Sequence, residues 1–128
     1  MIISTRINMK KILILEDDPD IGEIVEIALS PKYVTLVKRT DKGLQEHINS
    51  FQPDVMLIDN HIGQTDASVI ISKIKAGENY KSIPFILFSG SNDIKTLAEE
   101  LGATAYLPKP FNLNQLYQCV ENVLTIEA

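Results

Sequence analysis

The chain has 128 residues, the length of one ordinary domain, and it is 45% hydrophobic and 23% charged. This composition is typical of a globular protein and excludes an intrinsically disordered chain. The formal net charge of −5, from 12 basic and 17 acidic residues, argues against direct binding to nucleic-acid phosphates, which requires a basic face.

Cysteine usage and hydropathy indicate the cellular setting. Cys119 is the single cysteine, so an intramolecular disulfide is excluded and a reducing, cytoplasmic setting is indicated. No apolar run approaches ~18 residues, the length that predicts a membrane span, and the first residues do not resemble a signal peptide. We therefore expect no membrane association, an N-terminal extension at residues 1–9 and one domain at residues 10–128.

Five short apolar runs predict β-strands. In chain order they are Ile12–Leu15, Val34–Val37, Val55–Ile58, Phe85–Phe88 and Ala105–Leu107. Because none of them alternates with polar residues, they are typical of parallel strands that are covered on both faces.

Segments with helical periodicity separate and follow these runs. The first is the apolar stripe Ile21, Ile24, Val25, Ala28 and Leu29, preceded by Asp18 as N-cap and Pro19 at the first helical position. The later helices are expected near Leu44–Phe51, Val69–Ile74, Ile94–Leu101 and Leu113–Leu124, with caps at Thr40–Asp41 and Asn92–Asp93 and with Gly102 ending the fourth. The alternation predicts an α/β fold with a doubly wound parallel sheet, which binds ligands at the carboxyl ends of its strands.

Polar side chains gather at those predicted strand ends: Glu16 and Asp17 after the first strand, Asp59 after the third, Ser89 after the fourth and Lys109 after the fifth. Each residue alone is most often a turn or surface residue. Together, clustered carboxylates repel one another unless a cation is present, and they suit a hard divalent ion. An amine and a hydroxyl beside them fit a phosphoryl group, and an aspartate can be the nucleophile that accepts it.

The segments ILILEDDPDI, PDVMLIDNHI, IPFILFSGS and GATAYLPKPF resemble, in order and spacing, the response-regulator receiver domain of two-component signalling. The resemblance covers about residues 10–125. It implies a flavodoxin-like (βα)5 fold with strand order 2-1-3-4-5. It also implies a cytoplasmic phosphoprotein that takes a phosphoryl group from a histidine kinase or histidine phosphotransfer protein.

The resemblance implies a role for each site residue. Asp59 is the phosphoacceptor, and Lys109 and Ser89 contact the phosphoryl group. Glu16, Asp17, Asp59 and the backbone carbonyl of His61 are expected to hold Mg²⁺ or Mn²⁺. Ser89 and Tyr106 form the switch, and a cis Lys109–Pro110 bond is expected. The domain would catalyse its own phosphorylation and dephosphorylation without being a conventional turnover enzyme.

The expected readout is the face formed by the fourth helix, the fifth strand and the last helix. It would bind a target protein or a second copy of the chain. No DNA-binding output domain is expected in this chain, which is either a stand-alone receiver or a piece of a longer regulator or hybrid kinase.

The chain departs from the family pattern after the acceptor, where it reads NHIGQTDA. Gly63 replaces the usual proline and Ala67 the usual glycine, so the loop and the start of the third helix are left open. The His61 side chain faces either the attacking water or solvent. Two alternative functions remain: a phosphorylation-independent adaptor with a receiver fold, and a haloacid-dehalogenase-type phosphohydrolase using Asp18-Pro19-Asp20.

Overall fold

The computed structural model describes residues 9–77 and 83–127. The predicted extension therefore lies almost entirely outside the described residues. Five parallel strands form the central sheet, and each coincides with a predicted run: β1 (Lys11–Leu15), β2 (Val34–Lys38), β3 (Val55–Asp59), β6 (Phe85–Ser89) and β7 (Ala105–Pro108).

The strand order in the sheet is β2-β1-β3-β6-β7, and every neighbouring pair is parallel. Counting only these five strands, this is the order 2-1-3-4-5 that the sequence predicts for a flavodoxin-like fold. Strands β3 and β6 are buried along their whole length, whereas the edge strand β2 is half-buried. The chain reverses its winding direction between β1 and β3, so their carboxyl ends flank a topological switch point.

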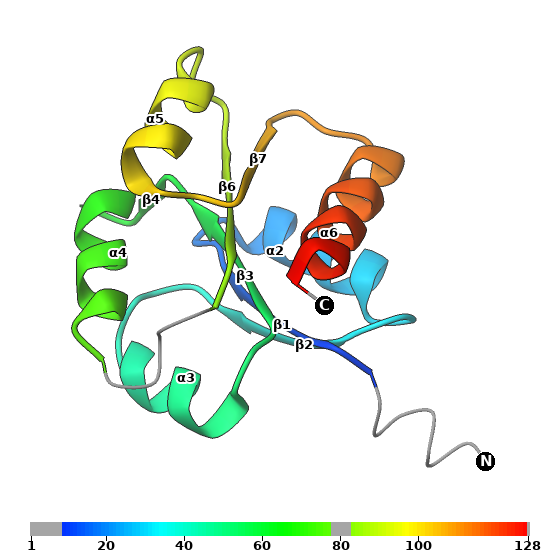
Figure 1. Ribbon diagram of the computed structural model, residues 1–128, viewed down its shortest axis with the longest axis horizontal. Helices are drawn as coiled ribbons and strands as arrows, with labels where there is room; N and C mark the ends of the chain where they lie inside the picture. Colours follow the sequence, from blue (N-terminus) through cyan, green and yellow to red (C-terminus); the bar gives the residue numbers. More distant parts are fainter. Residues whose placement is uncertain (1–8, 78–82, 128) are drawn as a thin grey trace.

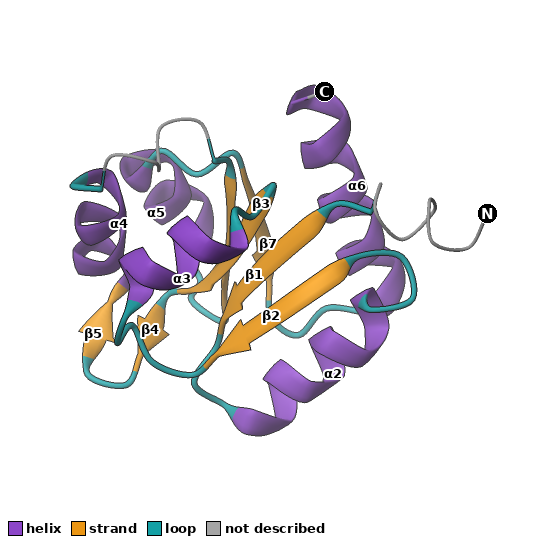
Figure 2. Cartoon of the chain, turned by 90° about the horizontal axis from the view of Figure 1, so that it is seen from below, coloured by secondary structure: helices purple, strands orange, loops and turns teal. Residues whose placement is uncertain are grey.

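Five helices cover the two faces of the sheet, and all lie near predicted positions: α2 (Pro19–Leu29), α3 (Leu44–Phe51), α4 (Ala67–Lys75), α5 (Ile94–Leu101) and α6 (Leu113–Glu127). Helices α2 and α6 lie on one face, and α3, α4 and α5 lie on the other (Figures 1 and 2). One apolar core therefore forms on each side of the sheet, which explains why the strands read as continuous apolar runs.

The helix caps follow the sequence in part. Asp18 caps α2 as predicted, because its carboxylate accepts the N–H groups of Asp20 and Ile21. Gly102 ends α5 with a φ of 76°, as expected. The prediction of a Thr40–Asp41 cap is wrong: Gly43 is the N-cap of α3, and the Asp41 carboxylate instead pairs with Lys73 of α4 at 2.6 Å.

Part of the predicted apolar stripe of α2 faces solvent. Val25 and Leu29 are fully buried, but Ile24 is 57% exposed and lies outside the core, so its assignment to the buried stripe is wrong. The sequence stripe is wider than the face that the helix presents to the sheet, and Ile27 is also exposed. No helix within residues 9–77 and 83–127 is long and apolar enough to cross a membrane.

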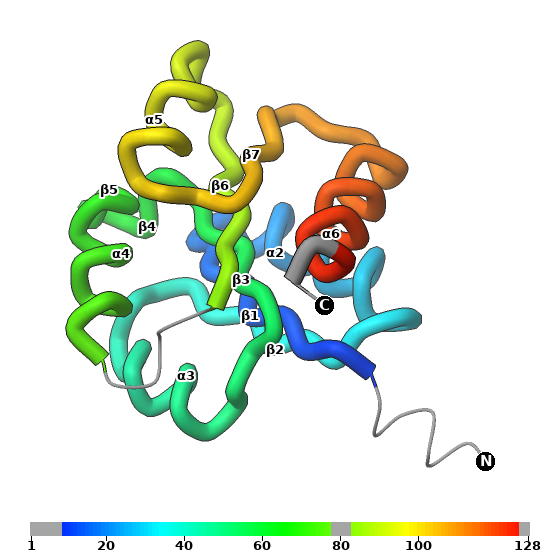
Figure 3. Tube along the Cα trace, in the orientation of Figure 1, coloured from blue at the N-terminus to red at the C-terminus, as the bar shows by residue number. Residues whose placement is uncertain are grey.

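An antiparallel hairpin follows β3 that the sequence did not predict. Its strands are β4 (His61–Ile62) and β5 (Thr65–Asp66), joined through Gly63 with a φ of 62°. The tube in Figure 3 shows the chain leaving β3, turning through this hairpin and continuing directly into α4. Helix α4 begins at Ala67, where the Asp66 carboxylate caps it by accepting the N–H of Ser68. The loop after the predicted acceptor is thus a short hairpin, and the third predicted helix begins at Ala67.

Candidate phosphoacceptor and metal site

The predicted site residues meet at the carboxyl edge of the sheet. Glu16 and Asp17 directly follow β1, Asp59 is the last residue of β3, and Lys109 directly follows β7. The register places Asp59 beside Phe88, so Ser89 follows one residue later at the end of β6. Parallel pairing alone therefore brings together residues that are up to 93 positions apart in the sequence.

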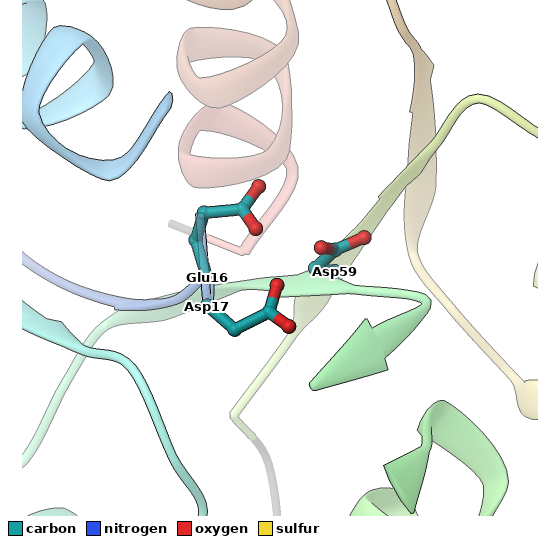
Figure 4. Close-up of side chains that lie close together, drawn as sticks. All are labelled: Glu16, Asp17 and Asp59. Atoms are coloured by element: carbon teal, nitrogen blue, oxygen red, sulfur yellow. The ribbon is translucent and has the colours of Figure 1, made fainter. Parts of the chain in front are cut away.

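Three carboxylates form the centre of the site. Glu16, Asp17 and Asp59 each offer an oxygen, and these oxygens lie within 4.8 Å of one another. Figure 4 shows Glu16 and Asp17 projecting from the end of β1 on the side of Asp59. Glu16 is fully buried and Asp59 is 9% exposed, which is unusual for acidic side chains. An all-oxygen donor set with this spacing fits a hard divalent cation such as Mg²⁺ or Mn²⁺.

The lysine predicted from the sequence lies against two of these acids. Its Nζ is 2.8 Å from Glu16 Oε1 and 3.3 Å from Asp59 Oδ1. Burial by itself would lower the pKa of Lys109, but the hydrogen bond to Glu16 and the charge of Asp59 outweigh it and raise this pKa. Lys109 therefore stays protonated and places a positive charge beside the predicted acceptor. The peptide bond between Lys109 and Pro110 is cis, as expected.

Glu16 has the most perturbed carboxyl group of the site. Burial, reinforced by the neighbouring Asp59 carboxylate, raises the pKa of Glu16 from 4.5 to about 7. Lys109 and the N–H of Asp18, which donates to Glu16 Oε2 at 3.1 Å, act in the opposite direction but are insufficient. Burial and Asp59 thus disfavour the ionised form of Glu16, and a bound cation would offset the charge that these acids carry when ionised.

Asp17 is oriented by a group that the sequence did not point to. Its Oδ2 accepts the backbone N–H of Gly63 at 2.8 Å, and this hydrogen bond holds the pKa of Asp17 below its usual range. A proline at position 63 would have no N–H to donate. The replacement of the usual family proline by glycine therefore ties the β4–β5 hairpin to the acid cluster. In the sequence, Gly63 was visible as a departure from the family pattern. Nothing in the sequence indicated that its N–H binds Asp17.

The remaining predicted residues lie around this centre. Ser89 is 5% exposed, and its Oγ accepts the N–H of Ser91 at 3.0 Å. Tyr106 lies on β7 with 39% exposure, and the exposed His61 is paired with Asp66 in the hairpin. Asp18 serves as the α2 cap and is outside the acid cluster, so nothing at Asp18 suggests the phosphohydrolase alternative.

The family follows from sequence comparison. The model of the response regulator receiver domain matches residues 12–121. The chain belongs to the response regulator receiver family. Receiver domains are the signal-receiving modules of two-component systems, so this assignment confirms the resemblance and the fold class.

Named relatives agree with the assignment. The transcriptional regulatory protein KdpE of Staphylococcus aureus is 36% identical over 110 residues, which cover 83% of this chain and 46% of KdpE. The DNA-binding regulator RpaA of Synechocystis is 28% identical over 120 residues, which cover 91% of this chain and 49% of RpaA. The chain thus spans about half the length of these two curated relatives.

Solved receiver structures share the fold. The chemotaxis response regulator CheY4 of Vibrio cholerae has a TM-score of 0.81 at 21% identity, covering 91% of this chain and 99% of CheY4. The receiver domain of the sensor histidine kinase PA1611 of Pseudomonas aeruginosa has a TM-score of 0.79 at 23% identity, covering 91% of this chain and 98% of that one. In the latter structure a magnesium ion is coordinated in the active-site cleft.

Proposed function

We propose that this receiver domain accepts a phosphoryl group on Asp59 from a histidine kinase or a histidine phosphotransfer protein. The observation that carries the proposal is the position of the Asp59 carboxylate, within 4.8 Å of two further acids and 3.3 Å from the Lys109 ammonium. A segment of the sensor histidine kinase TmoS of Ectopseudomonas mendocina is 25% identical to this chain over 119 residues, 12% of that protein's length, which agrees with a role in histidine-kinase signalling.

In the proposed reaction, an Asp59 oxygen attacks the phosphorus of a phosphohistidine. The new O–P bond forms as the P–N bond breaks, and the imidazole nitrogen leaves with the electron pair of that bond. Lys109 places its positive charge next to the attacking carboxylate and can donate to an oxygen of the transferred group. Water then attacks the phosphorus, the O–P bond to Asp59 breaks, inorganic phosphate is released and Asp59 returns to its carboxylate form.

The donor set fits Mg²⁺ or Mn²⁺, held by the carboxylates of Glu16, Asp17 and Asp59 and by the backbone carbonyl of His61. When bound, the ion supplies positive charge that offsets the charge of the phosphoryl oxygens. The contacts of the ligand carboxylates determine where the ion would be held. Gly63 orients Asp17, and the N–H of Asp18 with Lys109 orients Glu16.

Ser89 and Tyr106 form the proposed switch. The Ser89 hydroxyl accepts a backbone N–H and so keeps its own proton free to donate to a phosphoryl oxygen. Movement of Ser89 toward the site would open space into which the exposed Tyr106 turns. The face made by α5, β7 and α6 would then change, which is a two-state response to a local charge event.

This face is the proposed contact surface for a target protein or a second copy of the chain. Direct contact with nucleic acid is not part of the proposal for this domain, because its net charge is −5. A cytoplasmic location agrees with the single cysteine and with the family's partners.

Phosphorylation is tested by incubating the protein with Mg²⁺ and acetyl phosphate and measuring its intact mass. We expect the mass of one phosphoryl group to be added to the wild-type chain and none to be added to Asp59→Asn. Equal labelling of the two proteins would contradict the proposal. Tight binding of a partner that is unaffected by Asp59→Ala, Mg²⁺ and phosphodonor would instead favour the adaptor function.

A further inference from the structure

The Lys109 ammonium has a third neighbour besides the two acids. Its Nζ lies over the ring of Phe88, 4.7 Å from the ring centroid. Phe88 is fully buried on β6, directly before Ser89 and beside Asp59 in the strand register. At this distance the negative face of an aromatic ring attracts a cation.

We propose that Phe88 is a positioning residue that holds the Lys109 ammonium between Glu16 and Asp59 through the face of its ring. This inference rests on the proposed function, because it assigns to Phe88 an effect on the phosphorylation rate of Asp59. It adds a residue whose apolar side chain gave no reason to include it in the site.

Lys109 needs such a partner because of its own chemistry. Its side chain has a flexible four-carbon stem, and its ammonium is a point charge with no preferred direction of approach. Its two charged partners, Glu16 and Asp59, both belong to the acid cluster that fits a cation. A carboxylate that contributes to a cation site attracts the lysine less strongly, whereas the ring of Phe88 takes no part in that site.

The location strengthens the contact. The Lys109 side chain is only 19% exposed, so its ammonium is largely shielded from water. Cation–π attraction increases when the cation is desolvated. The ring is itself held in place, because Phe111 packs edge-on against it at 6.3 Å between centroids and an interplanar angle of 60°. The packed ring of Phe88 therefore limits where the ammonium of the flexible Lys109 side chain can lie.

Ring fluorination separates the electrostatic role of Phe88 from packing. One, two or three fluorines at position 88 weaken the negative ring face while changing the ring's size little. We expect the rate of Asp59 labelling by acetyl phosphate to fall with each fluorine, by about tenfold in total. The matched control is the same fluorination at Phe85, a buried residue of the same strand that packs in the core on the other face of the sheet. A labelling rate that does not change with fluorination at position 88 would overturn the proposal. So would a rate that falls equally with fluorination at positions 85 and 88.

A second measurement reads the contact without phosphorylation. The side-chain protons of Lys109 should carry an upfield ring-current shift in the NMR spectrum, which Phe88→Leu removes and Phe85→Leu retains. The Mg²⁺ affinity of Phe88→Leu should stay within about twofold of wild type, because the three carboxylates are untouched. A Lys109 shift unaffected by Phe88→Leu would overturn the contact. Absence of Asp59 labelling in the wild-type chain would instead overturn the proposed function, whatever the NMR shift.

Discussion

Strand β3 has an aspartate at each end, and the two have opposite environments. Asp54, just before the strand, exchanges two hydrogen bonds of 2.8 Å with the backbone of Lys11 at the start of β1. Asp59, the last residue of the strand, faces two other carboxylates within 4.8 Å. The first aspartate satisfies backbone groups and joins two strands, whereas the second lies beside two carboxylates and the Lys109 ammonium. One residue type therefore joins strands at one edge of the sheet and contributes to the candidate site at the other.

The largest expected effect is the complete loss of labelling when the second of these aspartates is replaced, compared with its retention when the first is replaced. Asp54→Ala removes the acceptor for the Lys11 N–H and should lower the free energy of unfolding by about 1–2 kcal/mol, while Asp59 labelling is retained. Asp59→Asn should abolish labelling yet raise the metal-free unfolding free energy by about 1 kcal/mol, because it relieves carboxylate repulsion. Urea unfolding and intact-mass analysis measure both. A destabilised Asp59→Asn protein would remove the contrast between the two strand ends.

The pH dependence of stability should reveal the unfavourable charge at the site. The pKa of Glu16 is about 7 in the fold, against 4.5 as its ordinary value. Between these values the folded state binds more protons than the unfolded state, so the unfolding free energy of metal-free protein falls as the pH rises through this window. We expect this group to account for a loss on the order of 2–3 kcal/mol. Glu16→Gln should flatten the profile; an unchanged profile would contradict the assignment.

Mg²⁺ should reverse this loss. An ion that binds the folded site and not the unfolded chain stabilises the protein by about 2–3 kcal/mol at a hundred times its dissociation constant. We expect the melting temperature to rise with Mg²⁺ at pH 8 in wild type and in Asp54→Ala, and to change little in Asp17→Asn. A melting temperature that ignores millimolar Mg²⁺ would count against the metal site.

The smallest effect concerns the hairpin that orients Asp17. Gly63→Ala places a side chain at a φ of 62°, which should cost about 1 kcal/mol and loosen the hydrogen bond to Asp17. Gly102→Ala is the matched control, because Gly102 has a φ of 76°, equally open surroundings and no contact with the site. Both variants should lose similar stability, but only Gly63→Ala should bind Mg²⁺ several-fold more weakly. Calorimetric titration would show whether the two differ.

The sheet and its acid cluster were predictable because they depend on pattern and topology. Apolar runs gave the strands, their alternation with helical stripes gave the parallel sheet, and the carboxyl ends of parallel strands share one edge. The resemblance then identified Glu16, Asp17, Asp59, Ser89 and Lys109 as one site, and the structure brings the three carboxylates and Lys109 together there.

The contacts that orient these residues were not predictable. A backbone N–H such as that of Gly63 belongs to every residue except proline, so its partner appears only when the hairpin is folded. Phe88 reads as a core residue, and its contact with Lys109 depends on the conformation of a long side chain. The exposure of Ile24 depends on how α2 is rotated over the sheet, which a stripe of five apolar residues does not determine.

The register of β6 also limits which sequence changes this fold tolerates. Leu87 packs in the core beneath α4 and α5, whereas Phe88 packs in the core beneath α2 and α6, since neighbouring side chains point to opposite faces. Deleting one residue from β6 would send the aromatic ring to the wrong layer and withdraw the Ser89 hydroxyl from the end of the strand. The length of β6 therefore sets both the core layer that Phe88 enters and the position of Ser89 at the edge of the site.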